Sequence, residues 1–398
     1  MLNIPDRWRM LSVLFLARTA MAYQFQTVGS DGPFLIDTLD IGFAQFGTLI
    51  GLYMLPGIVI ALPGGMLGQR FGVKRVVLAG LGLMAVGGAL MGTDSVLLVF
   101  IGRLTSGLGA VFVNVLMTKM VTDWFAGREI VTALAVFVTS WPLGIALGLI
   151  SFPLIAAAYS WGAVMHVGAA VALVCLVLIL FVYRSSPDAP PEAGRLQIDL
   201  TRREWVLISL AGFIWGSYNA GYVILISFLP ELFSERGYPL AEASRVVSLL
   251  AWVLIPSVPI AGYLSERIHK PNLVMIGGFA IVATAAAILP LAPVPIVPFA
   301  AIVLTIGLPA GLIMALSSEA LRPENRSAGM GVFYTWHYAA MAVLPAVAGT
   351  ARDLFGNPAA PSLFAALLMA LAAGALVGFR LAQRPPLRTP PLTGQRSG

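Results

Sequence analysis

Long apolar runs alternate with short polar segments along the whole chain. Each run holds the roughly 20 residues that a helix needs to cross the hydrocarbon core of a bilayer. The pattern predicts an all-α membrane protein of twelve transmembrane helices. The predicted spans are 10–34, 43–66, 75–93, 96–119, 130–156, 161–183, 205–229, 242–264, 272–292, 295–317, 328–350 and 361–380.

The chain also repeats itself at half its length. A shift of 197 residues superposes Trp8 on Trp205, Pro33 on Pro230, Gly65 on Gly262, Leu67 on Leu264, Arg70 on Arg267 and Gly80 on Gly277. Such duplication is typical of carriers, whose halves rock about a solute site near the bilayer midplane. We expect an N-terminal six-helix bundle over 1–183, a cytoplasmic linker over 184–204, a C-terminal six-helix bundle over 205–380, and a disordered cytoplasmic tail over 381–398.

Composition and charge agree with this class. Hydrophobic residues make up 59% of the chain and charged residues 11%, a balance that a water-soluble domain cannot cover with polar surface. The basic residues, which give a net charge of +6, lie at the ends of apolar runs and form no stripe for nucleic acid. Most fall on the side of the N-terminus, so both termini are expected to be cytoplasmic, in a bacterial inner membrane.

Two motifs connect the chain to a known family. Residues 65–75, GMLGQRFGVKR, resemble the G-x-L-x-D-R-x-G-R-K signature of the major facilitator superfamily, and residues 103–109, RLTSGLG, resemble its R-x-x-x-G-x-G element. The resemblance implies two six-helix bundles related by a pseudo-two-fold axis, and transport by alternating access. It also implies that Arg103 serves either helix packing or proton handling.

The first motif departs from the signature at one position. Gln69 replaces the acidic residue, whereas the second half keeps Glu266 at the equivalent place. If that carboxylate pairs with arginines when the cytoplasmic face closes, the latch formed by Gln69, Arg70, Glu266 and Arg267 depends on its second-half copy.

Shorter stretches resemble particular groups within the superfamily. Residues 16–20, LARTA, and 27–33, TVGSDGP, are similar to the first helix of cyanate and nitroimidazole transporters. Residues 123–128, DWFAGR, resemble a loop of nitrate and nitrite porters.

Arg18 is the leading candidate for solute binding. It lies about nine residues, or roughly 13 Å, into its predicted span, close to the midplane. A charged side chain there costs at least ~2.5 kcal/mol and normally faces a wet cavity. We expect Arg18 to bind or gate an anion; the alternative is an arginine satisfied by backbone carbonyls.

Aromatic and polar side chains of the second half complete the predicted site. His337 lies at the same depth as Arg18, in the segment Tyr334-Thr-Trp336-His337-Tyr338. A second set, which follows helical spacing on the seventh span, is predicted to line the cavity: Trp215, Tyr218, Asn219 and Tyr222. Packing between helices is the alternative for both sets.

The absence of acidic residues from the middle of the predicted spans sets the solute class. Cation exporters and many sugar–proton symporters need a buried carboxylate. This chain is therefore expected to carry a small anion or an electron-rich neutral solute, of the cyanate, nitrate or carboxylate type. The alternatives are a proton-coupled exporter of hydrophobic compounds, using His337 or Arg103, and a receptor that keeps the fold without transport.

No motif predicts catalysis, a metal site or a cofactor. The three histidines and the single Cys175 form no ligand set, and no phosphate loop or activated nucleophile is present in the sequence. The expected partners are a small-molecule substrate and the lipid bilayer, with a proton as a candidate co-transported ion. We expect no nucleic acid partner and a monomer.

Overall fold

The computed structural model describes residues 5–30, 32–125, 129–187, 200–322 and 325–383. Within them the chain forms sixteen helices and no strand, which confirms the all-α fold class. The helices are α1 Asp6–Gly29, α2 Gly32–Leu39, α3 Phe43–Leu52, α4 Pro56–Phe71, α5 Val73–Met91, α6 Val96–Trp124, α7 Ile130–Ala158, α8 Trp161–Phe181, α9 Arg202–Glu235, α10 Leu240–Val247, α11 Leu249–Ile268, α12 Pro271–Ile288, α13 Ile296–Thr305, α14 Ala310–Ala320, α15 Arg326–Phe355 and α16 Ala360–Gln383.

Four of the twelve predicted spans are divided between two helices: α1 and α2, α3 and α4, α10 and α11, and α13 and α14. Proline explains two of these breaks, because its nitrogen cannot donate within a helix. Pro56 begins α4, and Pro309 precedes α14. Parts of the predicted linker and tail, 188–199 and 384–398, lie outside the described residues.

Ten helical segments of the described chain are long and apolar enough to cross a membrane. The first and eleventh predicted spans are not among them, because polar side chains lower their hydropathy. Helix α1 carries Arg18, Gln24 and Gln26, and α15 carries His337. The two long helices outside that set are therefore those that hold Arg18 and His337.

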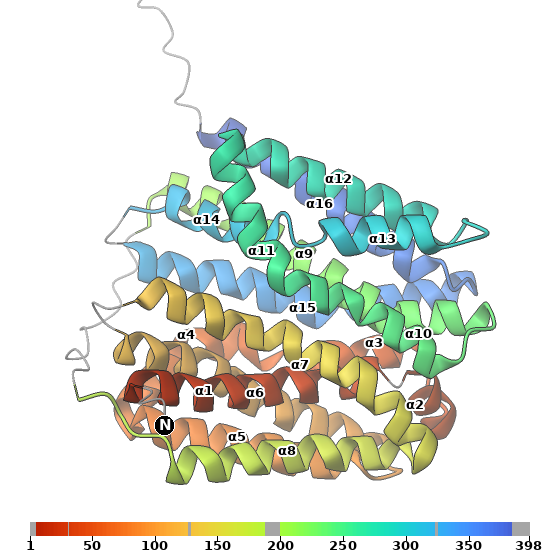
Figure 1. Ribbon diagram of the computed structural model, residues 1–398, viewed down its shortest axis with the longest axis horizontal. Coiled ribbons are helices and arrows are strands. Elements are labelled where there is room, and N and C mark those ends of the chain that lie inside the picture. The colour runs from red at the N-terminus through yellow and green to blue at the C-terminus, as the bar shows by residue number, and fades with distance from the viewer. Residues whose placement is uncertain (1–4, 31, 126–128, 188–199, 323–324, 384–398) are drawn as a thin grey trace, which may run out of the picture.

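Helix packing follows the sequence repeat. In the first half α1 packs against α7 and α8, and in the second half α9 packs against α15 and α16. Helix α5 contacts α6 and α8, as α12 contacts α13 and α16. Figure 1 shows the first group in the lower part of the molecule and the second in the upper part, with the long helices side by side. We call the surface where residues 6–181 meet residues 202–383 the seam.

The seam is closed most tightly where α3 packs on α15. We call this end of the molecule, on the right in Figure 1, the opposite end. We call the end where α1 begins the N-terminal end. A Cβ atom on Gly51 would lie 2.0 Å from the Ala342 carbonyl oxygen, and one on Gly349 would lie 1.9 Å from the Phe43 carbonyl oxygen. The two backbones are in direct contact here, so any larger side chain would separate the halves.

Polar contacts differ between the two ends. At the opposite end the Asp353 carboxylate of α15 accepts from the backbone N–H groups of Phe43 and Ala44, at 3.0 and 2.7 Å, and so caps α3 across the seam. At the N-terminal end each ion pair between described residues stays within one half, as in Arg7 with Glu129 at 3.0 Å. The hydrogen bonds of Asp353 therefore join the two halves at the opposite end, whereas no ion pair between described residues joins them at the N-terminal end.

Candidate functional site

The Arg18 side chain is half-buried and reaches from α1 to the backbone of α7. Its Nη1 donates to the carbonyl oxygens of Phe137 at 3.0 Å and Val138 at 3.3 Å. The Val138 carbonyl is available because its helical partner four residues later is Pro142, which has no N–H. The proline thus creates an acceptor for the intramembrane arginine. This role of Pro142 was not predicted from the sequence, although a proline inside the predicted span 130–156 indicates a carbonyl without its helical partner.

The other edge of the guanidinium is linked to the second half of the chain. Arg18 Nε donates to Asn114 Oδ1 of α6 at 3.3 Å, and Asn114 Nδ2 donates to the Tyr338 hydroxyl of α15 at 3.2 Å. Arg18 Nη2 has no hydrogen-bond partner in the described part of the chain. Arg18 therefore belongs to a polar chain across the seam and keeps donor capacity for a solute.

Aromatic rings surround His337 on the α15 side of this polar chain. Its ring centroid lies 5.3 Å from Tyr338, 6.0 Å from Trp215 and 6.2 Å from Tyr334. Two polar atoms in this cluster, His337 Nδ1 and Trp215 Nε1, are buried without a hydrogen-bond partner. Arg18, His337, Trp215 and Tyr334 of the predicted site are thus brought together, along with Tyr338.

The remaining members of the seventh-span stripe have different surroundings. The Tyr218 hydroxyl donates to the Ile306 carbonyl at 2.8 Å, in the break between α13 and α14. Asn219 Nδ2 donates to the Trp215 carbonyl of its own helix at 2.8 Å. Tyr222 is buried, and its hydroxyl has no partner. The side chains of Tyr218 and Asn219 therefore donate to carbonyl oxygens of the second half, whereas the Tyr222 hydroxyl has no partner among the described residues.

Trp336 lies away from the His337 cluster. Trp336 is 41% exposed and packs edge to face on Phe213, at 6.1 Å between ring centroids. The structure does not bring Trp336 to Arg18.

Arg103 is fully buried within the first half. Its Nε and Nη2 donate to the carbonyl oxygens of Leu49 and Phe25, both at 2.8 Å, and its Nη1 to Gln24 O at 3.3 Å. The guanidinium also lies over the Tyr53 ring, 4.6 Å from its centroid. Arg103 therefore ties α6 to α1 and α3, and all its contacts lie in one half.

The predicted latch lies at the N-terminal end. Arg70 is exposed, with its guanidinium 5.4 Å from the centroid of the Phe71 ring, and Arg267 is exposed on α11. Neither makes an ion pair with a described residue. The side chains of Gln69 and Glu266 lie outside what the structure describes, so the latch stays a prediction.

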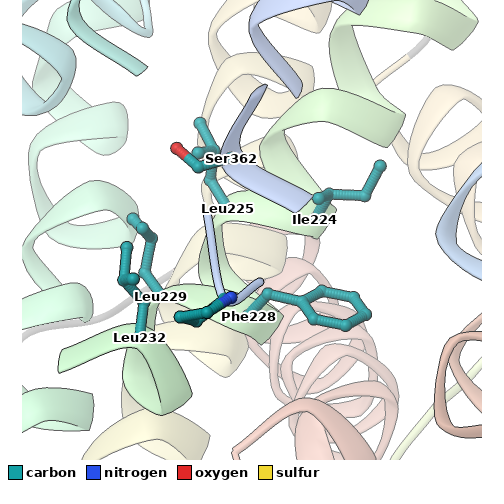
Figure 2. A pocket seen from close by; sticks show the side chains of 7 residues that line it. Ile224, Leu225, Phe228, Leu229, Leu232 and Ser362 are labelled. Carbon is teal, nitrogen blue, oxygen red and sulfur yellow. The ribbon is translucent and has the colours of Figure 1, made fainter. Parts of the chain in front are cut away.

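Two other spaces in the fold lie away from the Arg18 and His337 cluster. Figure 2 shows a crevice between α9 and the start of α16, lined by Leu225, Phe228 and Leu229 among others, which has no room for a water molecule. A larger space of about 570 Å³ lies beside the turn between α4 and α5 and is lined by Arg70, among others. Its lining residues belong to the first half and to the start of the linker, at Ser185 and Ser186, so neither space lies between the halves.

The chain resembles transporters over much of its length. It is 22% identical to the hexuronate transporter of Bacillus subtilis over 67% of this chain and 66% of that protein. It is 25% identical to the choline/ethanolamine transporter FLVCR2 of Homo sapiens, over 48% of this chain and 38% of that protein. A third relative, the 3-(3-hydroxy-phenyl)propionate transporter of Escherichia coli, is 27% identical over 60% of this chain and 59% of that protein. The chain thus spans less than two thirds of the length of each of these relatives.

Solved structures and a family model agree on the fold. The nucleoside transporter NupG superposes with a TM-score of 0.77 at 14% identity, over 96% of this chain and 100% of that one. A D-xylose–proton symporter superposes with a TM-score of 0.72 at 14% identity, over 91% and 97%. The narrower resemblance to cyanate, nitroimidazole and nitrate transporters stays a prediction. The model of the Major Facilitator Superfamily matches residues 14–345, and the chain belongs to this family of membrane transporters.

Proposed function

We propose that this transporter moves small organic anions by alternating access, and that Arg18 binds the anionic group of the solute. The observation that carries the proposal is the surroundings of Arg18. Its guanidinium lies in the seam, and among the described residues Nη2 has no hydrogen-bond partner and no ion pair includes Arg18. A buried charge without a counter-ion is costly, so an anionic solute would stabilise it.

The aromatic cluster suits the apolar part of such a solute. Trp215, Tyr334 and Tyr338 present ring surface around His337, and two unused ring nitrogens accompany them. Aromatic walls with a few convergent polar groups are typical of small-molecule sites. We therefore expect the preferred solute to combine a carboxylate with a hydrophobic or weakly polar body.

The names of the relatives divide on solute charge. Hexuronate and 3-(3-hydroxy-phenyl)propionate are organic anions, whereas choline is a cation. Aromatic rings alone would also suit a quaternary ammonium through cation–π contact. The positive charge of Arg18, linked to Tyr338 through Asn114, would repel such a cation, and this favours the anion.

We further propose that residues 1–183 and 205–380 move as two bodies about the seam, and that the N-terminal end faces the bacterial cytoplasm. Basic side chains gather at that end, as in the space lined by Arg70, Lys74, Arg75 and Lys119. Membrane proteins retain such residues on the cytoplasmic side.

A thermal-shift screen of the purified protein tests the proposed function. Ligands stabilise the state they bind, by about 2.7 kcal/mol at 100 times Kd. We expect glucuronate, 3-phenylpropionate or acetate to raise the Tm of the wild-type protein, and choline or cationic dyes to leave it unchanged. The Arg18→Ala variant should lose the shift, whereas Arg70→Ala should keep it. Stabilisation by cations alone, or an undiminished anion shift in Arg18→Ala, would overturn the proposal.

A further inference from the structure

Buried polar atoms without hydrogen-bond partners are concentrated on two helices. Of the ten described side chains with such atoms, five lie on α9, and three lie on α1 or at its C-terminal cap. Helices α1 and α9 are equivalent in the two halves, and they pack against each other across the seam. The unpaired groups are therefore concentrated on the two equivalent helices that meet at the seam.

Two of these groups from opposite halves meet at Gly29. Gln26 is 0% exposed, and neither atom of its amide has a partner. Ser227 of α9 is 4% exposed, and its hydroxyl is also unpaired. A Cβ atom on Gly29 would lie 2.9 Å from Gln26 Nε2 and 2.6 Å from Ser227 Oγ, so both groups border the same glycine. Ser30, the C-cap of α1, adds a third buried, unpaired hydroxyl.

Packing alone does not explain polar side chains at this place. A buried donor or acceptor without a partner destabilises the fold, whereas an apolar side chain of similar shape would not. The glutamine amide brings both an unused donor and an unused acceptor. Its partner is therefore expected in another conformation, where the seam is separated and polar molecules reach these atoms.

The position along α1 identifies that conformation. Gln26 lies eight residues after Arg18, about 12 Å further toward the opposite end at 1.5 Å per residue. This is the end at which the seam is closed in the present structure. When α1 and α9 separate there, Gln26 and Ser227 would lie on opposite walls of the opening, on the way to Arg18.

We propose that Gln26, Ser30 and Ser227 form a second, uncharged solute site between Arg18 and the opposite end. The site rests on the proposed function and takes the same organic anion. Gln26 Nε2 and the two hydroxyls donate hydrogen bonds to the oxygens of its carboxylate when that end is open. Neutral donors hold an anion less strongly than an arginine does, so the solute can pass on to Arg18.

Transport by the Gln26→Leu variant in proteoliposomes tests the site. The probe is glucuronate or 3-phenylpropionate, whichever stabilises the wild-type protein. With the solute added on the side of the opposite end, we expect the KM to rise about 3- to 10-fold and the Tm of the solute-free variant to rise by a few degrees. An unchanged KM would overturn the proposal, and so would a lower Tm, since a merely structural glutamine would destabilise the fold when removed.

Thr27→Val is the matched control. Thr27 is 1% exposed and adjacent to Gln26, but its hydroxyl donates to the Gln24 carbonyl of its own helix at 2.9 Å. Its replacement should leave the KM unchanged. If neither anion stabilises the wild-type protein, the proposed function fails; if one does and the KM of Gln26→Leu is normal, the second site alone fails.

Thiol labelling gives a readout that does not depend on the solute. In a Cys175→Ala background, Ser227→Cys should react with a membrane-impermeant thiol reagent added on the side of the opposite end. The control is Ser106→Cys, because Ser106 is 0% exposed and its hydroxyl donates to the Met84 carbonyl within the first half. We expect Ser227→Cys to be labelled at least tenfold faster; equal rates would exclude an opening of the seam at Gln26.

Discussion

The two intramembrane arginines of the first half have the same side chain but different surroundings. Arg103 is fully buried, and its three hydrogen bonds to backbone carbonyls all end in its own half. Arg18 is half-buried, is linked through Asn114 to Tyr338 in the other half, and has no partner for Nη2 among the described residues.

The difference separates a packing role from a binding role. Burial is costly for both guanidinium groups, so burial alone does not reveal function. The location of the acceptors does reveal function, because hydrogen bonds within one half would be kept when the halves move. Under the proposed movement of the halves, a polar chain across the seam would change in each transport cycle. We therefore expect Arg103 to govern stability and Arg18 to govern solute affinity.

The largest effect is expected from Arg103→Ala. It removes the guanidinium donor from the carbonyls of Leu49, Gln24 and Phe25 and opens a gap beside the Tyr53 ring. Hydrogen bonds to a charged group contribute about 1.5–3 kcal/mol each, so the loss of these bonds destabilises the fold by roughly that amount or more. The Tm of purified protein, followed by tryptophan fluorescence, should fall by roughly 5–10 °C. A normal Tm combined with lost solute binding would reverse the roles of the two arginines.

Arg18→Lys is expected to have the next largest effect, on affinity. The ammonium keeps the charge but cannot contact Asn114, the α7 carbonyls and a solute together. The Kd, measured by titration calorimetry, should rise about tenfold, or about 1.4 kcal/mol. Arg103→Lys is the matched control, since it should lower the Tm without changing the Kd of the folded fraction. A wild-type Kd for Arg18→Lys would mean that charge alone serves the solute.

Tyr338→Phe tests the link across the seam. The change keeps the ring beside His337 but removes the hydroxyl that accepts from Asn114 Nδ2. The loss of one neutral hydrogen bond is worth about 0.5–1.5 kcal/mol, so transport rates should fall roughly 2- to 10-fold. Tyr23→Phe is the control, because the Tyr23 hydroxyl bonds Ser151 within the first half. Equal losses of transport rate in both variants would show that the hydrogen bond across the seam matters no more than one within the first half.

The smallest effect is expected from Pro142→Ala. The new N–H can compete with Arg18 for the Val138 carbonyl, but Arg18 retains the Phe137 carbonyl and Asn114. The Kd should change by less than about threefold, or about 0.6 kcal/mol. Pro153→Ala, on the same helix, should leave the Kd unaltered. A change of tenfold or more in Pro142→Ala would show that the proline controls the pose of Arg18.

Hydropathy and the half-length repeat predicted the fold class and the recurring helix packing. Membrane spans need long apolar runs, and a lone arginine in such a run is conspicuous, which is why Arg18 and Arg103 could be identified. Their roles could not be separated, because the sequence does not show which carbonyls lie within reach. Arg103 Nε ends on Leu49, in a different span, and only packing determines that contact.

The predicted aromatic set shows the same limit. Spacing of three and four residues placed Trp215, Tyr218, Asn219 and Tyr222 on one stripe, but it does not show which neighbour each member meets. Tyr218 bonds a carbonyl in the break between α13 and α14, which the apolar pattern of that span concealed. Asn114 and Tyr338 were missed because their importance depends on the approach of α6 and α15.

The Asp353 cap on α3 has a consequence for the order in which the protein is made. The N–H groups of Phe43 and Ala44 obtain their acceptor from a residue about 310 positions later in the chain. During synthesis the start of α3 therefore waits, without this partner, until nearly the whole polypeptide has been translated. These bonds lie at an exposed helix start, so water serves the two N–H groups until then, and the final placement of α3 should be a late step of folding.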